Sequence, residues 1–136
     1  MSVAAPLTLF DVAQRAMSAQ LVRMNAASSN LANAGSISAS EADAYRPIRA
    51  VFATEMDKAS GLATVRVGAV QRDNVTPLKQ HNPDHPLADA EGNVWAAPVD
   101  ENAEMVEMLD ASRQYQNMIE ALSTAKQLML DTMRMK

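Results

Sequence analysis

The chain has 136 residues, enough for one modest domain, and carries a formal net charge of −4 at pH 7 with a pI near 5.1. The acidic balance argues against nucleic acid as the main partner, and the absence of cysteine excludes disulfides, zinc–thiolate sites and thiol catalysis. No apolar run is long enough to span a bilayer. Residues 1–10 lack the basic start of a secretory signal, so we expect any export to use another route.

The first predicted element is a long helix that begins near Thr8 and ends before Gly35. Thr8 is a good N-cap, and Asp11 three residues later completes an approximate capping box. Gly35 is expected to end the helix, because glycine adopts the left-handed conformation without strain. Within the helix, apolar residues recur at alternating intervals of three and four, interrupted only by Gln20, which is typical of a helix packed lengthwise on another helix. This series contains Phe10, Ala13, Met17, Met24, Ala27 and Leu31.

Two asparagines lie near the end of this helix. Asn30 and Asn33 are three residues apart and therefore share a face, next to Leu31. An amide at a helix–helix contact lowers stability but selects one register and one partner. A frayed helix end that favours Asn and Ser explains the same spacing, so both interpretations stay open.

The middle of the chain, residues 36–100, predicts a small β-rich or irregular lobe. Residues 36–44 are small and polar, as in a flexible connector. Residues 45–52 predict a short strand, which Pro47 confines to a sheet edge or a strand start. Residues 62–72 alternate between apolar and polar side chains and predict a strand more strongly.

A second long helix is predicted from about residue 103 to residue 136, a stretch without Gly or Pro. Pro98 stands just outside it, and Asp100 or Asn102 would cap its first turn. Acidic residues gather at its start and basic residues at its end, in the order that the helix dipole favours. Its apolar series, again at intervals of three and four, contains Met108, Ala111, Tyr115, Met118, Leu122, Ala125 and Met129.

These elements predict a mainly α fold, in which long N- and C-terminal helices pack as a coiled-coil-like pair beside the small middle lobe. We divide the chain into an N-terminal helical segment, 1–35, a middle lobe, 36–100, and a C-terminal helix, 101–136, which packs with 1–35 in the same core. The first forty residues contain only three charged side chains. Either the middle segment covers this under-charged surface in a monomer, or other copies of the chain do. The shortness of the middle segment favours other copies.

Candidate chemical sites are weak. His81 and His85 have the spacing of a helical zinc pair, but the prolines at 83 and 86 prevent a helix there. Residues 89–93 resemble part of a calcium loop, yet Leu87 and Pro98 would occupy its first and last ligand positions. Acidic residues such as Glu104 and Glu107 are ordinary in a first helical turn, although they could serve a glycosidase. We therefore predict no catalytic residue, no metal site, no cofactor and no enzyme.

Several motifs, in order along nearly the whole chain, resemble those of one family. The run SSNLANA at residues 28–34 resembles the N-terminal signature of bacterial flagellar rod and hook proteins. Further motifs narrow the resemblance to the proximal rod proteins of that family: FDVA at 10–13, YR at 45–46, NPDHPLAD at 82–89, EMVEM at 104–108 and ASRQYQ at 111–116.

The resemblance implies a structural subunit of the proximal rod in the flagellar basal body. Such a subunit assembles helically through its terminal helices into a drive shaft that carries torque between the membrane ring and the distal rod and hook, and that motility requires. The implied partners are copies of itself, other rod proteins, membrane-ring and rod-adaptor proteins, and the flagellar type III export apparatus, which would export the chain to the periplasm without a cleaved signal peptide. Neither nucleic acid nor direct membrane insertion is implied.

Two alternatives from other classes remain. The chain could be a cytosolic helical adaptor that binds one partner helix, or a cell-wall glycosidase that uses Glu104 or Glu107. Secretion that depends on the flagellar apparatus would favour the rod subunit over the adaptor. Unchanged peptidoglycan turnover after substitution of both glutamates by glutamine would remove the glycosidase.

Overall fold

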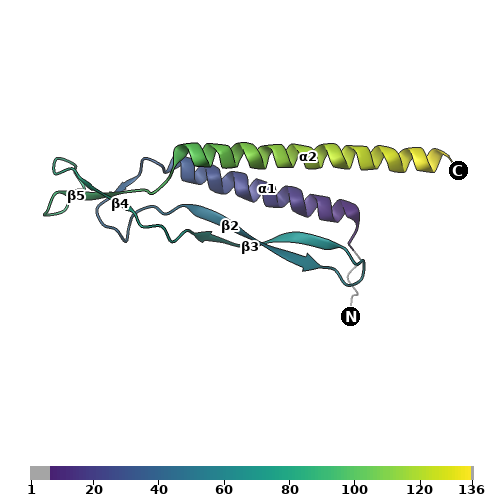
Figure 1. Cartoon of the computed structure of the whole chain (residues 1–136), viewed down its shortest axis with the longest axis horizontal. Coiled ribbons are helices and arrows are strands. Elements are labelled where there is room, and N and C mark those ends of the chain that lie inside the picture. Colours follow the sequence, from purple (N-terminus) through teal and green to yellow (C-terminus); the bar gives the residue numbers. More distant parts are fainter. Residues whose placement is uncertain (1–6, 136) are drawn as a thin grey trace.

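The computed structural model of the chain describes residues 7–135 and contains two helices and five strands within them. In chain order these are α1 (Leu9–Ala32), β1 (Ile37–Ser38), β2 (Ile48–Met56), β3 (Ala63–Arg72), β4 (Leu78–His81), β5 (Asn93–Ala96) and α2 (Glu101–Arg134). The two helices lie antiparallel and side by side, and the β2–β3 hairpin runs along the other side of α1 (Figure 1). α1 is thus the middle layer of an elongated molecule, with α2 on one side and the hairpin on the other. Neither helix holds a segment both long and apolar enough to cross a membrane, as far as residues 7–135 are concerned.

The start of α1 confirms the predicted capping box. Thr8 Oγ1 accepts a hydrogen bond from the Asp11 N–H at 3.2 Å, and Asp11 Oδ2 accepts one from the Thr8 N–H at 2.9 Å. At the other end, the prediction for Gly35 is wrong, because its backbone is not in the left-handed region. Asn33 ends the helix instead. Its backbone N–H and its Nδ2 both donate to the Ser29 carbonyl, at 3.1 and 2.8 Å, so no left-handed residue is needed.

The start of α2 confirms Asp100 as the N-cap, with Asp100 Oδ1 accepting from the N–H groups of Asn102 and Ala103 at 3.0 and 3.2 Å. With 34 residues, α2 is about 51 Å long, against about 36 Å for the 24 residues of α1. Leu9, the first residue of α1, shares a groove with Leu122 and Ala125 of α2. The last turns of α2 therefore extend beyond α1, as Figure 1 shows.

The expectation of a mainly α fold with a small middle lobe is wrong. β2 and β3 pair antiparallel along nine residues of β2, from Ile48 opposite Arg72 to Met56 opposite Ala63, and this hairpin packs along α1. A second antiparallel sheet has the strand order β1-β5-β4. One of its strands, β1, arises in the segment expected to be a connector. The chain is an α+β protein in which the hairpin is a full layer.

The hairpin contains a β-bulge. Its register shifts between Val51 and Phe52, which pair with Ala69 and Val67, so the extra residue is Gly68 of β3. The hairpin also covers a further side of α1 and so accounts for part of its low charge.

The turn between β4 and β5 depends on Gly92. Its φ is +79°, and a Cβ there would lie 2.9 Å from Pro83 Cβ and 3.1 Å from His81 Cε1. We expect Gly92→Ala to lower the free energy of unfolding by about 1–3 kcal/mol, since it adds backbone strain and a steric clash together. Gly35→Ala is the matched control, because a Cβ at Gly35 meets nothing within 4 Å. Urea unfolding followed by circular dichroism measures the stability of both variants. Equal losses of stability would contradict the requirement for glycine at position 92.

Candidate functional site

Most of the predicted contact residues of the two helices lie where α1 and α2 run side by side. Ala27 and Ala111 are completely buried. Two grooves hold members from both helices, one with Ala13 beside Met118, Leu122 and Ala125, the other with Met24 and Leu31 beside Met108. Phe10 and Met129, at the ends of the two series, are exposed. Asn30 is completely buried, and the other predicted residues are half-buried: Met17, Asn33 and Tyr115, together with the groove members just named.

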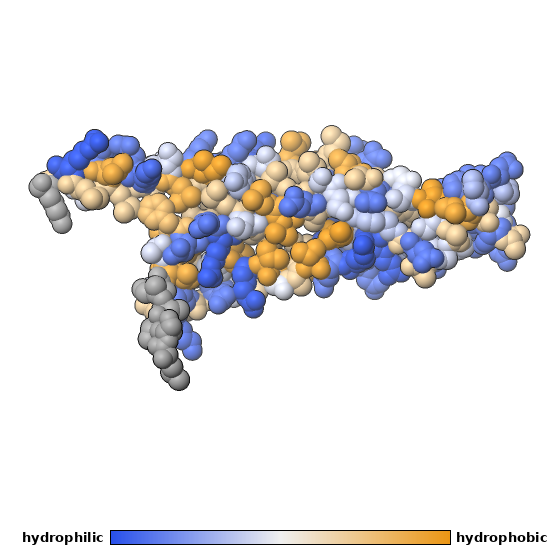
Figure 2. Space-filling view, turned by 180° about the vertical axis from the view of Figure 1, so that it is seen from behind, coloured by the Kyte–Doolittle hydropathy of each residue, from blue (hydrophilic) through white to orange (hydrophobic). Residues whose placement is uncertain are grey.

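The apolar interior of the molecule is small. Apart from two prolines, the buried apolar side chains among residues 7–135 are Val94 and seven alanines: Ala19, Ala26, Ala27 and Ala111 on the helices, and Ala44, Ala96 and Ala97 outside them. Alanine lets helix backbones approach closely but removes little apolar area from water. Many larger apolar side chains reach the surface instead, among the helices along the upper edge of Figure 2 and on the hairpin along its lower edge.

Asn30 joins both helices to the hairpin. Its Nδ2 donates to the Ile48 carbonyl at 3.0 Å and to Glu104 Oε2 at 3.1 Å, while its Oδ1 accepts from the Ile48 N–H at 2.7 Å and from the Tyr45 hydroxyl at 2.9 Å. The amide thus uses both of its donors and both of its acceptor positions, although it is completely buried. A fully satisfied buried amide fixes one relative position of the three elements that it contacts.

Glu104 is the charged member of the same network and is only 1% exposed. Its Oε1 accepts a hydrogen bond from Arg49 Nη2 of β2 at 2.6 Å. That hydrogen bond raises the pKa of Arg49 above its usual range, against the opposing effect of burial. Pairing is what allows a carboxylate to remain buried. We call Asn30, Tyr45, Ile48, Arg49 and Glu104 the Asn30–Glu104 network.

The sequence contained one signal for Glu104. It lies seven residues before Ala111 and therefore continues the apolar series of α2 by one heptad. A buried carboxylate at such a position requires a partner that pairs with its charge. Which residue supplies that partner could not be derived, because Arg49 lies 55 residues earlier on a strand whose extent was not foreseen.

A second set of ion pairs crosses the two helices. Arg23 Nε lies 2.7 Å from Glu107 Oε1, and its Nη2 lies 2.9 Å from Asp110 Oδ2, while Gln20 Oε1 accepts from Nη1 at 2.8 Å. The hydrogen bond to Glu107 raises the pKa of Arg23. Pairs this exposed are worth at most about 1 kcal/mol each, so they fix the register of the helices more than they stabilise the fold.

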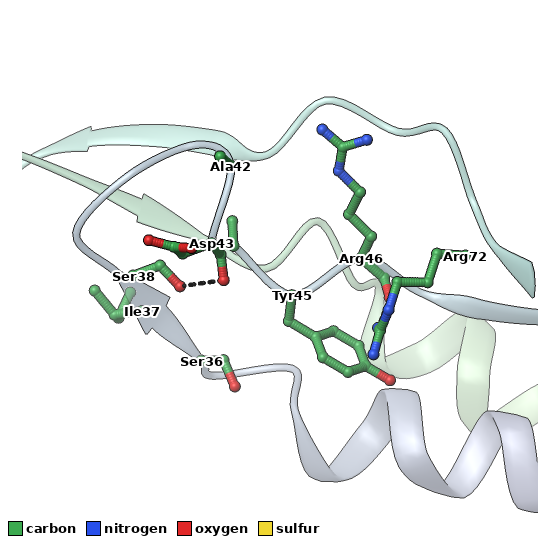
Figure 3. A pocket seen from close by; sticks show the side chains of 9 residues that line it. Ser36, Ile37, Ser38, Ala42, Asp43, Tyr45, Arg46 and Arg72 are labelled. Carbon is green, nitrogen blue, oxygen red and sulfur yellow. Dashed lines mark hydrogen bonds between the residues drawn. The ribbon is translucent and has the colours of Figure 1, made fainter.

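An open cleft of about 750 Å³ lies beside Tyr45 (Figure 3). The Arg72 guanidinium lies 5.2 Å from the centre of the Tyr45 ring and donates to the Arg46 carbonyl at 2.9 Å. Tyr45 is thereby held with its hydroxyl on Asn30 and 3.1 Å from Ser29 Oγ. The cleft is lined by Ser36, Ile37, Ser38, Ala42, Asp43, Ala44, Tyr45, Arg46 and Arg72.

The two histidines make separate hydrogen bonds and do not contact a common partner. His81 Nδ1 lies 3.4 Å from Asn93 Oδ1, and His85 Nδ1 accepts from the Leu87 N–H at 3.0 Å. In the part of the chain that the structure describes, no three His, Asp or Glu residues are grouped as metal ligands. Glu104 and Glu107, the two residues considered for a glycosidase, are each held by an arginine.

Two aspartates secure the beginning of α1. The backbone N–H and the hydroxyl of Thr8 lower the pKa of Asp11. The Ser60 hydroxyl, followed by the Leu7 N–H, lowers the pKa of Asp57 in the hairpin turn. Leu7 N–H donates to Asp57 Oδ2 at 3.1 Å, so Asp57 ties the residues before α1 to the tip of the hairpin.

These lowered pKa values predict that acid loosens the start of α1. A carboxylate with a folded pKa below its unfolded value stabilises the fold above the unfolded pKa, and that stabilisation is lost as the pH falls through the folded pKa. We therefore expect amide exchange at Leu7, Thr8 and Ser60 to be protected at neutral pH and to lose protection below the ordinary Asp pKa of 3.8. Asp57→Asn should remove this pH dependence at Leu7 but leave it at Thr8.

Comparisons with known proteins agree with the motifs. Residues 10–34 match the family model "Flagella basal body rod protein", and residues 90–135 match "Flagellar basal body rod FlgEFG protein C-terminal". The chain is 43% identical over 129 residues to the flagellar basal-body rod protein FlgC of Salmonella typhimurium, which covers 93% of this chain and 95% of the relative. It is 39% identical over 127 residues to FlgC of Yersinia enterocolitica, with the same two shares. The matched segments include α1 and α2 nearly in full. The chain therefore belongs to the FlgC family of flagellar basal-body rod proteins.

Proposed function

We propose that this protein is a non-enzymatic subunit of the proximal rod, which assembles helically through α1 and α2 and transmits torque between the membrane ring and the distal rod and hook. It would assemble with copies of itself, with other rod proteins and with the membrane-ring and rod-adaptor proteins. It would leave the cytoplasm through the flagellar type III export apparatus without a cleaved signal peptide. The helix-contact residues predicted from the sequence would form the assembling core, with the middle of the chain to one side.

The observation that carries this proposal is the distribution of apolar side chains. The buried apolar side chains are mostly alanines, while large apolar side chains of α2 are exposed to solvent, among them Leu109 at 66%, Leu128 at 62% and Met133 at 70% exposed. Large exposed apolar side chains along a helix indicate a contact with other protein. Neighbouring subunits in a rod wall would cover these side chains.

The Asn30–Glu104 network supports the mechanical part of the proposal. A shaft must not let its layers slide over one another, and this network joins α1, α2 and β2 through hydrogen bonds of 2.6–3.1 Å made by the buried side chains of Asn30 and Glu104. Directional bonds resist sliding in a way that apolar contact alone does not.

Complementation tests the proposal. The tagged chain is expressed in a flagellated bacterium that lacks its own FlgC, and swimming in soft agar and the protein content of purified basal bodies are measured. We expect swimming to be restored and the intact chain to be present in the basal bodies. Retention in the cytoplasm with a partner protein, in cells that remain non-motile, would favour a helical adaptor instead.

A further inference from the structure

The open cleft beside Tyr45 lies apart from the surfaces through which the helices would assemble. It measures about 750 Å³ and is bounded by strand β1, by the loop that leads to Tyr45 and by the end of β3 (Figure 3). All of its lining residues lie between residues 36 and 72, outside α1 and α2. We call it the Tyr45 cleft. Contacts made through the two helices therefore leave it open to a further partner.

The charge of the Tyr45 cleft favours an anionic ligand. Arg46 and Arg72 both line it, against one carboxylate, that of Asp43. Asp43 Oδ2 already accepts a hydrogen bond from the Ser40 hydroxyl at 2.8 Å. Among residues 7–135, neither arginine forms an ion pair. Two unpaired guanidinium groups in one cleft attract a negatively charged group, although the chain as a whole carries a net charge of −4.

One of the two guanidinium groups is held in place before any ligand binds. Arg72 lies 5.2 Å from the centre of the Tyr45 ring, and its Nη1 donates to the Arg46 carbonyl at 2.9 Å. Tyr45 is fixed in turn by its hydrogen bond to the buried Asn30. Within the described part of the chain, Nε and Nη2 of Arg72 and the guanidinium of Arg46 make no hydrogen bond. These donors suit a carboxylate, which a planar guanidinium binds through two parallel hydrogen bonds.

A strand edge forms another wall of the cleft. β1 is the outer strand in the sheet order β1-β5-β4, and both of its residues, Ile37 and Ser38, line the cleft. The Ala97 N–H donates to the Ser36 carbonyl at 3.0 Å. Because the direction of backbone hydrogen bonds alternates along an antiparallel strand, the N–H and carbonyl of Ile37 point to the side of β1 that no strand pairs with. An unpaired edge of this kind accepts an extended peptide.

We propose that the Tyr45 cleft binds an extended acidic segment of a partner protein. The backbone of that segment pairs with β1 at Ile37, and its carboxylates contact Arg46 and Arg72. A small inorganic anion would use the two arginines but not the strand edge, whereas an acidic peptide uses both. The inference goes beyond the rod function, because it assigns a binding site that the assembling helices do not form.

A titration of the isolated full-length chain, followed by NMR, tests the proposal. The probe is a capped hexapeptide of alternating valine and glutamate, and the matched peptide has glutamine in place of each glutamate. We expect saturable shifts at the backbone amides of Ile37 and Ser38 and at the Nε–H groups of Arg46 and Arg72. The glutamine peptide should bind at least about tenfold more weakly, since it cannot form charge-assisted hydrogen bonds.

Arg46→Gln should weaken binding of the glutamate peptide by about tenfold. The Arg46 guanidinium forms no ion pair among residues 7–135, so the variant should fold like the natural chain. Arg66→Gln is the matched control, because Arg66 is an exposed arginine of the hairpin outside the cleft. Its affinity for the peptide should equal that of the natural chain.

Several results would overturn the proposal. These are the absence of saturable shifts, equal binding of the two peptides, and equal losses in Arg46→Gln and Arg66→Gln. Inorganic phosphate serves as the second probe. If phosphate shifts the arginine signals as strongly as the peptide does, and the peptide leaves Ile37 and Ser38 unchanged, the cleft is an anion site only and the proposal of a peptide fails. None of these results bears on the rod function, which complementation tests separately.

Discussion

Replacing Asn30 by alanine is expected to lower the free energy of unfolding by about 2–4 kcal/mol, which is a large part of the stability of a small domain. The substitution leaves the Ile48 N–H and carbonyl and one Glu104 oxygen without the amide, and the Tyr45 hydroxyl keeps only Ser29 Oγ. Glu104 stays buried, and an incompletely paired buried carboxylate is costly. Urea unfolding of the purified chain, followed by circular dichroism, measures the change.

The matched control is Asn25→Ala, which changes the same residue type on an exposed position of the same helix. We expect its effect to stay within about 0.5 kcal/mol. A double-mutant cycle with Glu104→Ala should show strong non-additivity, because both residues belong to one network. Similar losses for Asn30→Ala and Asn25→Ala would show that the network contributes nothing to stability.

Enlarging Ala27 to leucine is expected to cost about 1–3 kcal/mol or more, and to weaken incorporation into basal bodies in proportion. Ala27 is completely buried, as is Ala111 on α2, so three additional carbon atoms have no space unless the helices move apart. Thermal unfolding of the isolated chain and the protein content of purified basal bodies provide the two measurements.

Ala32→Leu, an exposed position on the same helix, is the control and should change stability by only a few tenths of a kcal/mol. If Ala27→Leu proved as stable as this control, the close approach of the two helices would not depend on alanine. The position of the helix contact would then have to be set by the polar residues alone.

Local signals in the sequence were enough to predict both helices. Thr8 and Asp11 predicted the start of α1, Asp100 or Asn102 predicted the start of α2, where Asp100 is the cap, and the spacing of Ala27 and Ala111 identified residues that prove buried. Such features are readable because they depend on residues within one or two helical turns. The prediction for Gly35 was wrong, since an asparagine two positions earlier already donates a hydrogen bond to a free carbonyl at the end of α1.

The hairpin and the network could not be derived in the same way. The pairing of β2 with β3 continues across a register shift at Gly68, and the partnership of Arg49 with Glu104 joins residues distant in sequence. Asn30 was left between two interpretations because its spacing fits both. Its four hydrogen bonds belong to a buried position, whereas Asn33, three residues later, forms the helix end.

The alanine-lined contact between α1 and α2 has a mechanical consequence. An alanine side chain has no rotamers to change, so the tightest contacts of the helix pair have no alternative packing into which they could relax when the molecule is twisted. The methionines and leucines lie nearer the solvent, where conformational freedom allows them to fit neighbours of differing shape. The molecule thus combines an inner part whose side chains have no alternative packing with an outer part whose side chains adapt to neighbours of differing shape.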